Sequence, residues 1–214
     1  MKGRAIRVRR CLVRVAVLAC VTLGASACAG FHSNQGANQV YTLEAAGASP
    51  GSTAGPAAEA PGSTLQVLRP LAAPGLDTEH IALQRDPQRL DYYAASSWPA
   101  PLPEFLQSLA VDALRATGKY RAVQADGGAV AAEAVVQLEI RRFQAAYSGD
   151  GPPVAEVQLV ATFGRRADRT LIAAVSAEGR VAASENRMQA VVVAFQGAVD
   201  AALKQLAERA PAQF

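Results

Sequence analysis

The fold is decided by residues 136–163, VQLEIRRFQAAYSGDGPPVAEVQLVATF. Apolar residues alternate with polar ones from Val136 to Ile140, and the apolar phase then shifts by one residue before Phe143. Alternation with a period of two is typical of a strand that buries one face. The phase shift predicts a bulge or strong bend at Arg141–Arg142, within one long strand.

A second alternating run follows a segment rich in glycine and proline. Residues 148–153, SGDGPP, predict a turn, and every second residue from Ala155 to Phe163 is again apolar. Two alternating runs joined by a short turn predict an antiparallel hairpin. Residues 171–177 continue this pattern, so we expect a third strand beside the hairpin.

Two amphipathic helices are predicted, one before these strands in the sequence and one after them. Apolar residues recur at steps of three and four from Leu102 to Leu114, and Gly118 stands where a helix C-cap is expected. The second stripe runs from Met188 to Leu206, with Ser184 as its expected N-cap. Because this helix has no cationic excess on its polar face, we interpret it as a core helix rather than a membrane-lying one.

Short strands are also expected at 40–43, 65–68, 80–83 and 90–93, where apolar or aromatic runs are separated by prolines. Together, these elements predict a single α+β domain. Its sheet is expected to be mixed and mostly antiparallel, with the two main helices packed on one face.

The N-terminus has the pattern of an export signal. Six basic residues and no acidic ones occur in residues 1–14, and the apolar stretch Val15–Leu23 follows. This stretch is shorter than the ~20 residues that span a bilayer. We therefore expect residues 1–27 to be a removable signal peptide.

Two kinds of signal peptidase could cleave at the end of this segment. Ala25-Ser26-Ala27 fits ordinary secretory cleavage, whereas small residues that end in Cys28 resemble the lipobox of bacterial lipoproteins, although Ala25 replaces the usual Leu. Removal of the signal leaves Cys28 as the last cysteine, so no intrachain disulfide can form. Because a free thiol is a liability in an oxidising compartment, we expect Cys28 to be lipidated. Ala29, where retention at the inner membrane usually requires Asp, favours the outer membrane.

The charge of the chain changes when the signal is removed. The leader carries six of the 21 basic residues and none of the 18 acidic ones, which leaves 15 and 18, a formal charge of −3. This net negative charge gives no support for nucleic-acid binding. The expected organisation is a lipidated tether at 28–39 and a domain at 40–209. Within that domain, residues 45–64 are all Ala, Gly, Ser, Pro or Thr except Glu59, which predicts a flexible linker.

Catalytic motifs are weak in this sequence. Gly47–Gly51 matches the G-x-S-x-G pattern of hydrolases, but it lies in the linker rather than on a strand-to-helix turn. His32 and His80 are the only histidines, and no second cysteine remains to complete a zinc site. We therefore expect no catalytic residue, no cofactor and no metal.

Two groups of residues are candidates for partner contacts. The first is the aromatic segment with Asp91, Tyr92, Tyr93, Trp98 and Pro99, because Tyr and Trp are favoured in interaction hot spots. The same residues could equally join strands to helices in an ordinary core. The second group is the pairs Arg141-Arg142 and Arg165-Arg166, which predict either a solvated face or a contact with an acidic lipid or partner.

Several short motifs along the mature chain occur together in one known family. They are Tyr41-x-Leu43, Gly75-Leu76-Asp77-Thr78, Ile81, Arg89–Ala94, Trp98, Pro101-Leu102-Pro103, Arg169-Thr170-Leu171 and Glu185-Asn186. With these motifs the chain resembles the ABC-type transport auxiliary lipoproteins, the PqiC group, over most of its mature length, and the YYA…W…PLP segment is the most distinctive part. One departure is Ser97, where members often have Arg before the tryptophan.

The resemblance implies a non-catalytic accessory role in lipid transport between two membranes. The implied partners are an ABC ATPase, its permease and a periplasmic MCE-domain protein, with the lipoprotein anchored through Cys28 at the periplasmic face of the outer membrane. The oligomeric state stays open, a homo-oligomer included. The alternatives are an adaptor lipoprotein for an outer-membrane or peptidoglycan machine and, least favoured, an anchored hydrolase that uses Ser49 and His80.

Overall fold

The computed structural model of the protein describes residues 37–45 and 62–214. The predicted signal peptide, Cys28, the tether up to residue 36 and residues 46–61 of the predicted linker lie outside the described residues, as do Ser49 and His32.

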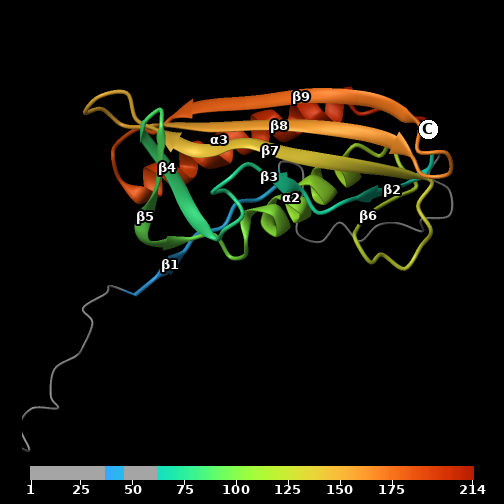
Figure 1. Cartoon of the computed structure of the whole chain (residues 1–214), viewed down its shortest axis with the longest axis horizontal. Coiled ribbons are helices and arrows are strands. Elements are labelled where there is room, and N and C mark those ends of the chain that lie inside the picture. The colour runs from blue at the N-terminus through green and yellow to red at the C-terminus, as the bar shows by residue number, and fades with distance from the viewer. Residues whose placement is uncertain (1–36, 46–61) are drawn as a thin grey trace, which may run out of the picture. The chain divides into compact units, whose positions relative to one another are not determined.

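One sheet and two helices make up the described part (Figure 1). The predicted α+β class is confirmed, because both helices pack against the sheet. The strands are β1 (Gln39–Val40), β2 (Thr64–Val67), β3 (Leu71–Ala72), β4 (His80–Asp86), β5 (Arg89–Ser97), β6 (Ala122–Ala125), β7 (Ala134–Ala146), β8 (Val154–Arg165) and β9 (Leu171–Ala182), and the helices are α2 (Leu102–Ala116) and α3 (Met188–Arg209).

The predicted hairpin forms the centre of the sheet. β7 pairs with β8 and β8 with β9, both antiparallel, along nearly their whole lengths. The predicted bulge is confirmed, because the pairing shifts between Ile140 and Arg142. The bulge keeps Phe143 on the same face as Ile140, and both side chains are 1% exposed. The alternation of the sequence therefore marks the buried face correctly.

The second edge of β7 is shared by three short parallel strands in succession. β2 pairs with Ala134–Val136, β3 with Glu139 and Ile140, and β4 with Ala145 and Ala146. Proline lacks the N–H needed for strand pairing, so Pro70 and Pro74 divide residues 64–84 into these pieces. The long pairings are thus antiparallel and the short ones parallel.

α3 covers the buried face of β8 and β9 at very close range. A Cβ atom at Gly179 of β9 would lie 1.9 Å from the carbonyl oxygen of Ala198, so only glycine fits there. The helix is long and apolar enough to meet a membrane-span criterion, but 56% of that window is buried within the domain. Packing on the sheet therefore accounts for its apolar character, as the sequence predicted.

Three predicted boundaries were wrong. α3 starts after Arg187, not Ser184, because β9 continues to Ala182 and the Ala183 N–H still bonds the Pro153 carbonyl. The strand predicted at 40–43 is confined to Gln39–Val40. The predicted linker is too long at both ends, since Ala45 is buried and Thr64 starts β2 with its N–H donated to Glu133.

Candidate docking surface

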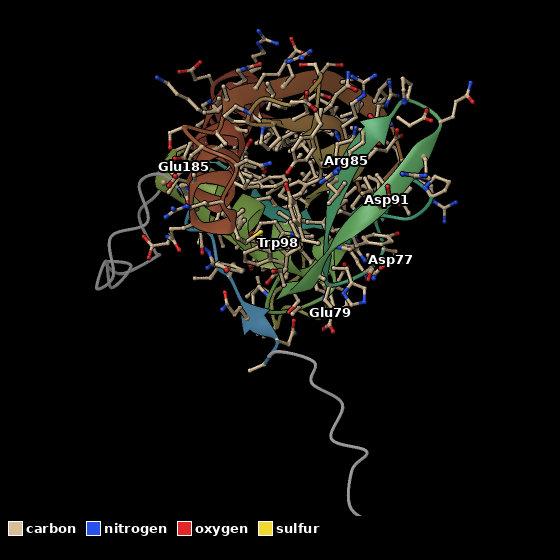
Figure 2. All side chains as sticks on the ribbon, turned by 90° about the vertical axis from the view of Figure 1, so that its left-hand side faces the viewer. Asp77, Glu79, Arg85, Asp91, Trp98 and Glu185 are labelled. Atoms are coloured by element: carbon tan, nitrogen blue, oxygen red, sulfur yellow. The ribbon has the colours of Figure 1, made fainter. Side chains whose placement is uncertain are left out.

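Trp98, which the sequence placed on a partner surface, is a core residue. Its side chain is 1% exposed and lies 5.8 Å from the ring of Phe143 and 5.4 Å from that of Phe195, both edge to face. Figure 2 labels it among the side chains in the middle of the domain. The prediction of a contact role for Trp98 was wrong, because the β5–α2 connection turns this large apolar ring inward, where it joins the two layers.

Tyr93 belongs to a polar network at the end of the sheet that carries β4 and β5. Its hydroxyl lies 2.9 Å from the hydroxyl of Tyr147, which in turn donates to Asn186 Oδ1 at 2.8 Å. The guanidinium of Arg85 lies over the Tyr147 ring, 4.9 Å from its centre. The network joins β4, β5, the end of β7 and the loop before α3. Asn186 was part of the family resemblance, but Arg85 and Tyr147 were missed, because they come from segments far apart in sequence.

Tyr92 holds the loop before β4 in place. Its side chain is 41% exposed, and its hydroxyl donates to the carbonyl of Gly75 at 2.8 Å. Gly75 has φ +85, and a Cβ there would lie 2.8 Å from Leu90. Glycine tolerates this left-handed conformation at little cost, which explains the residue at the start of the Gly75–Thr78 motif.

The rest of that motif fixes the start of α2. Leu76 is buried, and the carbonyl of Thr78 accepts the N–H of Leu102, the first residue of the helix. Glu79 likewise accepts the N–H of Trp98 through its carbonyl. Residues 75–78, Tyr92, Trp98 and Leu102 therefore meet around the starts of β4 and α2 and support the fold, whereas residues 169–171 lie at the opposite end of the sheet.

Of the predicted contact residues, Asp91, Tyr92 and Pro99 remain accessible to solvent. We call these three residues the β5 surface. Asp91 pairs with Arg89 at 3.0 Å, and Pro99 is exposed (Figure 2, which labels Asp91). Ala94 and Ala95 lie in the same strand, where pairing with β4 is interrupted between Ala82 and His80, and Ala95 has φ 49. A non-glycine residue with positive φ is uncommon, and it bends β5 beside its pairing with β1.

The described residues show no grouping of three or more His, Cys, Asp or Glu side chains that could hold a metal ion. His80 is exposed, and its ring lies 5.8 Å from that of Tyr92. The structure thus places His80 beside the β5 surface, and the G-x-S-x-G segment lies outside the described residues.

The predicted arginine pairs take different places. Arg142, with Arg180, flanks Glu156 on the face of the sheet that carries no helix, at 3.6 and 2.7 Å. Arg165 pairs with Asp168 in the turn between β8 and β9, and Arg166 donates to Gln66. Arg142, Arg165 and Arg166 therefore lie on the exposed surface, and each bonds to another residue of the domain.

Comparison with protein families assigns the chain to a known family. The model of the ABC-type transport auxiliary lipoprotein component matches residues 41–207, and the chain belongs to this family. It is accordingly a periplasmic lipoprotein and an auxiliary component of an ABC-type transport system. No curated protein matches the chain.

Two solved structures share the fold. The protein XCC0632 from Xanthomonas campestris is 24% identical, with a TM-score of 0.63, and the match covers 80% of this chain and 90% of that one. An uncharacterised protein is 11% identical, with a TM-score of 0.57, and the match covers 69% and 92%. At these identities the likeness concerns the fold alone.

Proposed function

We propose that the protein is a non-catalytic docking component of an MCE-type lipid transport system, anchored through Cys28 at the periplasmic face of the outer membrane. The family match over residues 41–207 carries this proposal. In this role the domain binds the end of a periplasmic MCE-domain protein, whose permease and ATPase lie in the inner membrane.

The position of the β5 surface supports this role. β1 pairs with β5 at Ser96 and Ser97, so the chain that comes from Cys28 enters the domain beside Asp91, Tyr92 and Pro99. Eight residues lie between Cys28 and Ala37, and the nine steps along the chain reach at most about 32 Å when it is extended. In the proposed role, the β5 surface is therefore held close to the anchoring membrane, where the end of an MCE conduit has to deliver or collect its lipid.

Two measurements on the tagged full-length chain, extracted from membranes in mild detergent, test the proposal. Mass analysis of the mature N-terminus should find a diacylated Cys28, and Cys28→Ser should move the protein to the soluble fraction. An unmodified N-terminus would falsify the anchor. The co-purified proteins should include an MCE-domain protein, and its consistent absence while other outer-membrane or peptidoglycan proteins are retained would favour the adaptor role.

Variants of the β5 surface sharpen this test. Asp91→Arg together with Tyr92→Ala should reduce the retained MCE protein at least tenfold, because opposed charge and a lost aromatic contact both act at an interface. Lys204→Ala on the exposed side of α3 is the control and should change nothing. Equal retention by both variants would move the docking site elsewhere.

A further inference from the structure

The face of the sheet that carries no helix has a hollow of about 530 Å³ at the end where β8 turns into β9. Its lining includes apolar groups from three segments, among them Leu68, Val135 and Leu171. Leu171 is 63% exposed, so its side chain is accessible at this edge of the hollow. The hollow therefore offers apolar contact to something outside the domain.

The glycine in the lining of this hollow stands where the pairing of β8 with β9 shifts, between Phe163 and Gly164. Gly164 lies in β8, outside the positive-φ glycines, and pairs with Val135. A Cβ there would be 3.4 Å from the Thr170 carbonyl oxygen and 3.9 Å from Val135 Cγ2, which is ordinary contact. Glycine inside a strand is destabilising relative to alanine, because its backbone loses more conformational freedom on folding. Besides marking this irregularity, Gly164 leaves the hollow without a side chain at this point, as glycines do where a ligand approaches a strand closely.

Three arginines line the same hollow: Arg165, Arg166 and Arg169. Arg169 is exposed in the β8–β9 turn, with φ 58. Within residues 37–45 and 62–214, no carboxylate lies within 4.0 Å of the guanidinium of Arg166 or Arg169, whereas Arg165 pairs with Asp168 at 3.0 Å. A guanidinium presents a planar fork of donors that matches a carboxylate. The hollow thus combines apolar contact with cationic groups on its rim.

The hollow lies at the far end of β7 from the β5 surface. Val135 of β7 lines it, whereas β4 meets β7 at Ala145 and Ala146. Ten residues of extended strand span about 33 Å, so the two sites are about that far apart. If Cys28 anchors the chain on the β1 side, as the proposed function holds, the hollow is turned toward a protein partner more than toward the anchoring leaflet.

We propose that this hollow binds an extended acidic segment of a partner protein. One apolar side chain of that segment lies over Gly164 between Leu68 and Leu171, and neighbouring carboxylates pair with Arg166 and Arg169. This inference rests on the proposed function only for its choice of a protein partner over a membrane.

The test uses the full mature chain from residue 28 with Cys28→Ser, which needs no detergent. The probe is a fluorescent peptide with alternating Asp and Leu, and its binding is measured by anisotropy at low salt. Matched peptides carry Lys or Asn in place of Asp. The acidic peptide should bind at least tenfold more tightly than either of them.

Two variants locate the binding. Gly164→Val fills the hollow, and Arg166→Gln with Arg169→Gln removes the two guanidinium groups that have no carboxylate partner among the described residues. Each change should weaken binding of the acidic peptide at least tenfold. Arg187→Gln, an exposed arginine at the other end of the sheet, is the control and should leave binding unchanged. Thermal unfolding checks that Gly164→Val stays folded, and the double arginine variant keeps the test independent of that substitution.

Three outcomes would overturn the inference: no binding of the acidic peptide, equal binding of the Lys or Asn peptide, or equal binding by the variants and the parent. Vesicles of phosphatidylglycerol and phosphatidylcholine are the competing probe, and sedimentation that depends on Arg166 and Arg169 without peptide binding would assign the hollow to lipid. A chain that retains an MCE protein but fails to bind the peptide rejects this inference alone. A chain that binds the peptide but never retains an MCE protein rejects the proposed function alone.

Discussion

The hydroxyl of Tyr147 lies 2.9 Å from that of Tyr93 and donates its only proton to Asn186. Tyr93 must therefore be the donor to Tyr147. Burial, together with this hydrogen bond, raises the pKa of Tyr93 far above its ordinary value, so the hydroxyl stays protonated at every physiological pH. The hydroxyl protons of Tyr93 and Tyr147 thus form the two hydrogen bonds that join three segments distant in sequence.

Replacement of the shared hydroxyl should destabilise the domain. Tyr147→Phe leaves the half-buried hydroxyl of Tyr93 without an acceptor, and the free energy of unfolding in urea should fall by about 1–2 kcal/mol. Tyr41→Phe is the control, because the Tyr41 hydroxyl bonds only the exposed Gln39, and it should stay within about 0.5 kcal/mol of the parent. Equal effects of the two variants would contradict the network.

The buried position of Trp98 predicts a large difference between two adjacent residues. Trp98→Ala should cost about 3–5 kcal/mol, because it empties the space between Phe143 and Phe195. Pro99→Ala should stay within about 0.5 kcal/mol, since Pro99 is exposed. Urea unfolding followed by intrinsic fluorescence suits the Pro99 variant, whereas circular dichroism is needed when the only tryptophan is removed.

Two glycines of the sheet should respond in opposite ways to the same substitution. Gly179→Ala forces a Cβ against the Ala198 carbonyl, so α3 must move, at a cost of about 3 kcal/mol or more. Gly164→Ala meets only ordinary contacts and should be neutral or stabilise by up to about 1 kcal/mol. Thermal unfolding of both variants checks this, and a destabilised Gly164→Ala would show that this glycine has a structural role.

Two glutamine side chains of α3 each bind both polar groups of one backbone residue. Gln196 bonds the N–H and the carbonyl of Glu44, and Gln205 does the same at Glu178 on the outer edge of β9. In hydrogen exchange, Gln196→Ala should speed exchange of the Glu44 amide at least tenfold and leave Glu178 unchanged. Gln205→Ala should show the reverse. If either variant changed exchange at both amides, or at neither, the two glutamine side chains would not act independently.

The domain should lose stability at high pH through Tyr120. Burial raises the pKa of Tyr120 to about 12, and its hydroxyl donates to the Pro211 carbonyl. Because the folded pKa lies above the ordinary value of 10.0, the contribution is complete below about pH 10 and is lost as the pH rises through about 12. In urea unfolding at pH 9 to 12, Tyr120→Phe should flatten the decline in stability relative to the parent. Tyr93 remains in both proteins, so the difference isolates Tyr120.

Local patterns in the sequence predicted the elements whose signal is local. The alternation in residues 136–163 predicted β7, β8 and the bulge at Arg141–Arg142, and the helical stripes predicted α2 and α3. β3 and β6 were missed, because two and four residues are too short for a period to show. Parallel pairing of β2 with both β6 and β7 also depends on distant segments, which no local pattern reports.

The candidate site was harder to predict than the fold. Trp98 satisfied the composition of a hot spot and of a core equally, and only the path of the β5–α2 connection decides between them. Arg85 and Tyr147 meet Tyr93 across three elements, so their association has no sequence signature. Gly164 and Arg169 became candidates only when the space around the glycine and the backbone angle of the arginine were known.

The shared edge of β7 also bears on the order in which an exported chain can fold. β2 and β3 precede β7 in sequence, yet their pairings with it depend on residues 134–140. A chain that crosses the inner membrane from its N-terminus delivers β2 and β3 to the periplasm about 70 residues before these pairing partners. During that interval, apolar residues such as Leu65 and Val67 have no finished sheet to join, so the interior of the domain can close only after residues 134–140 have followed.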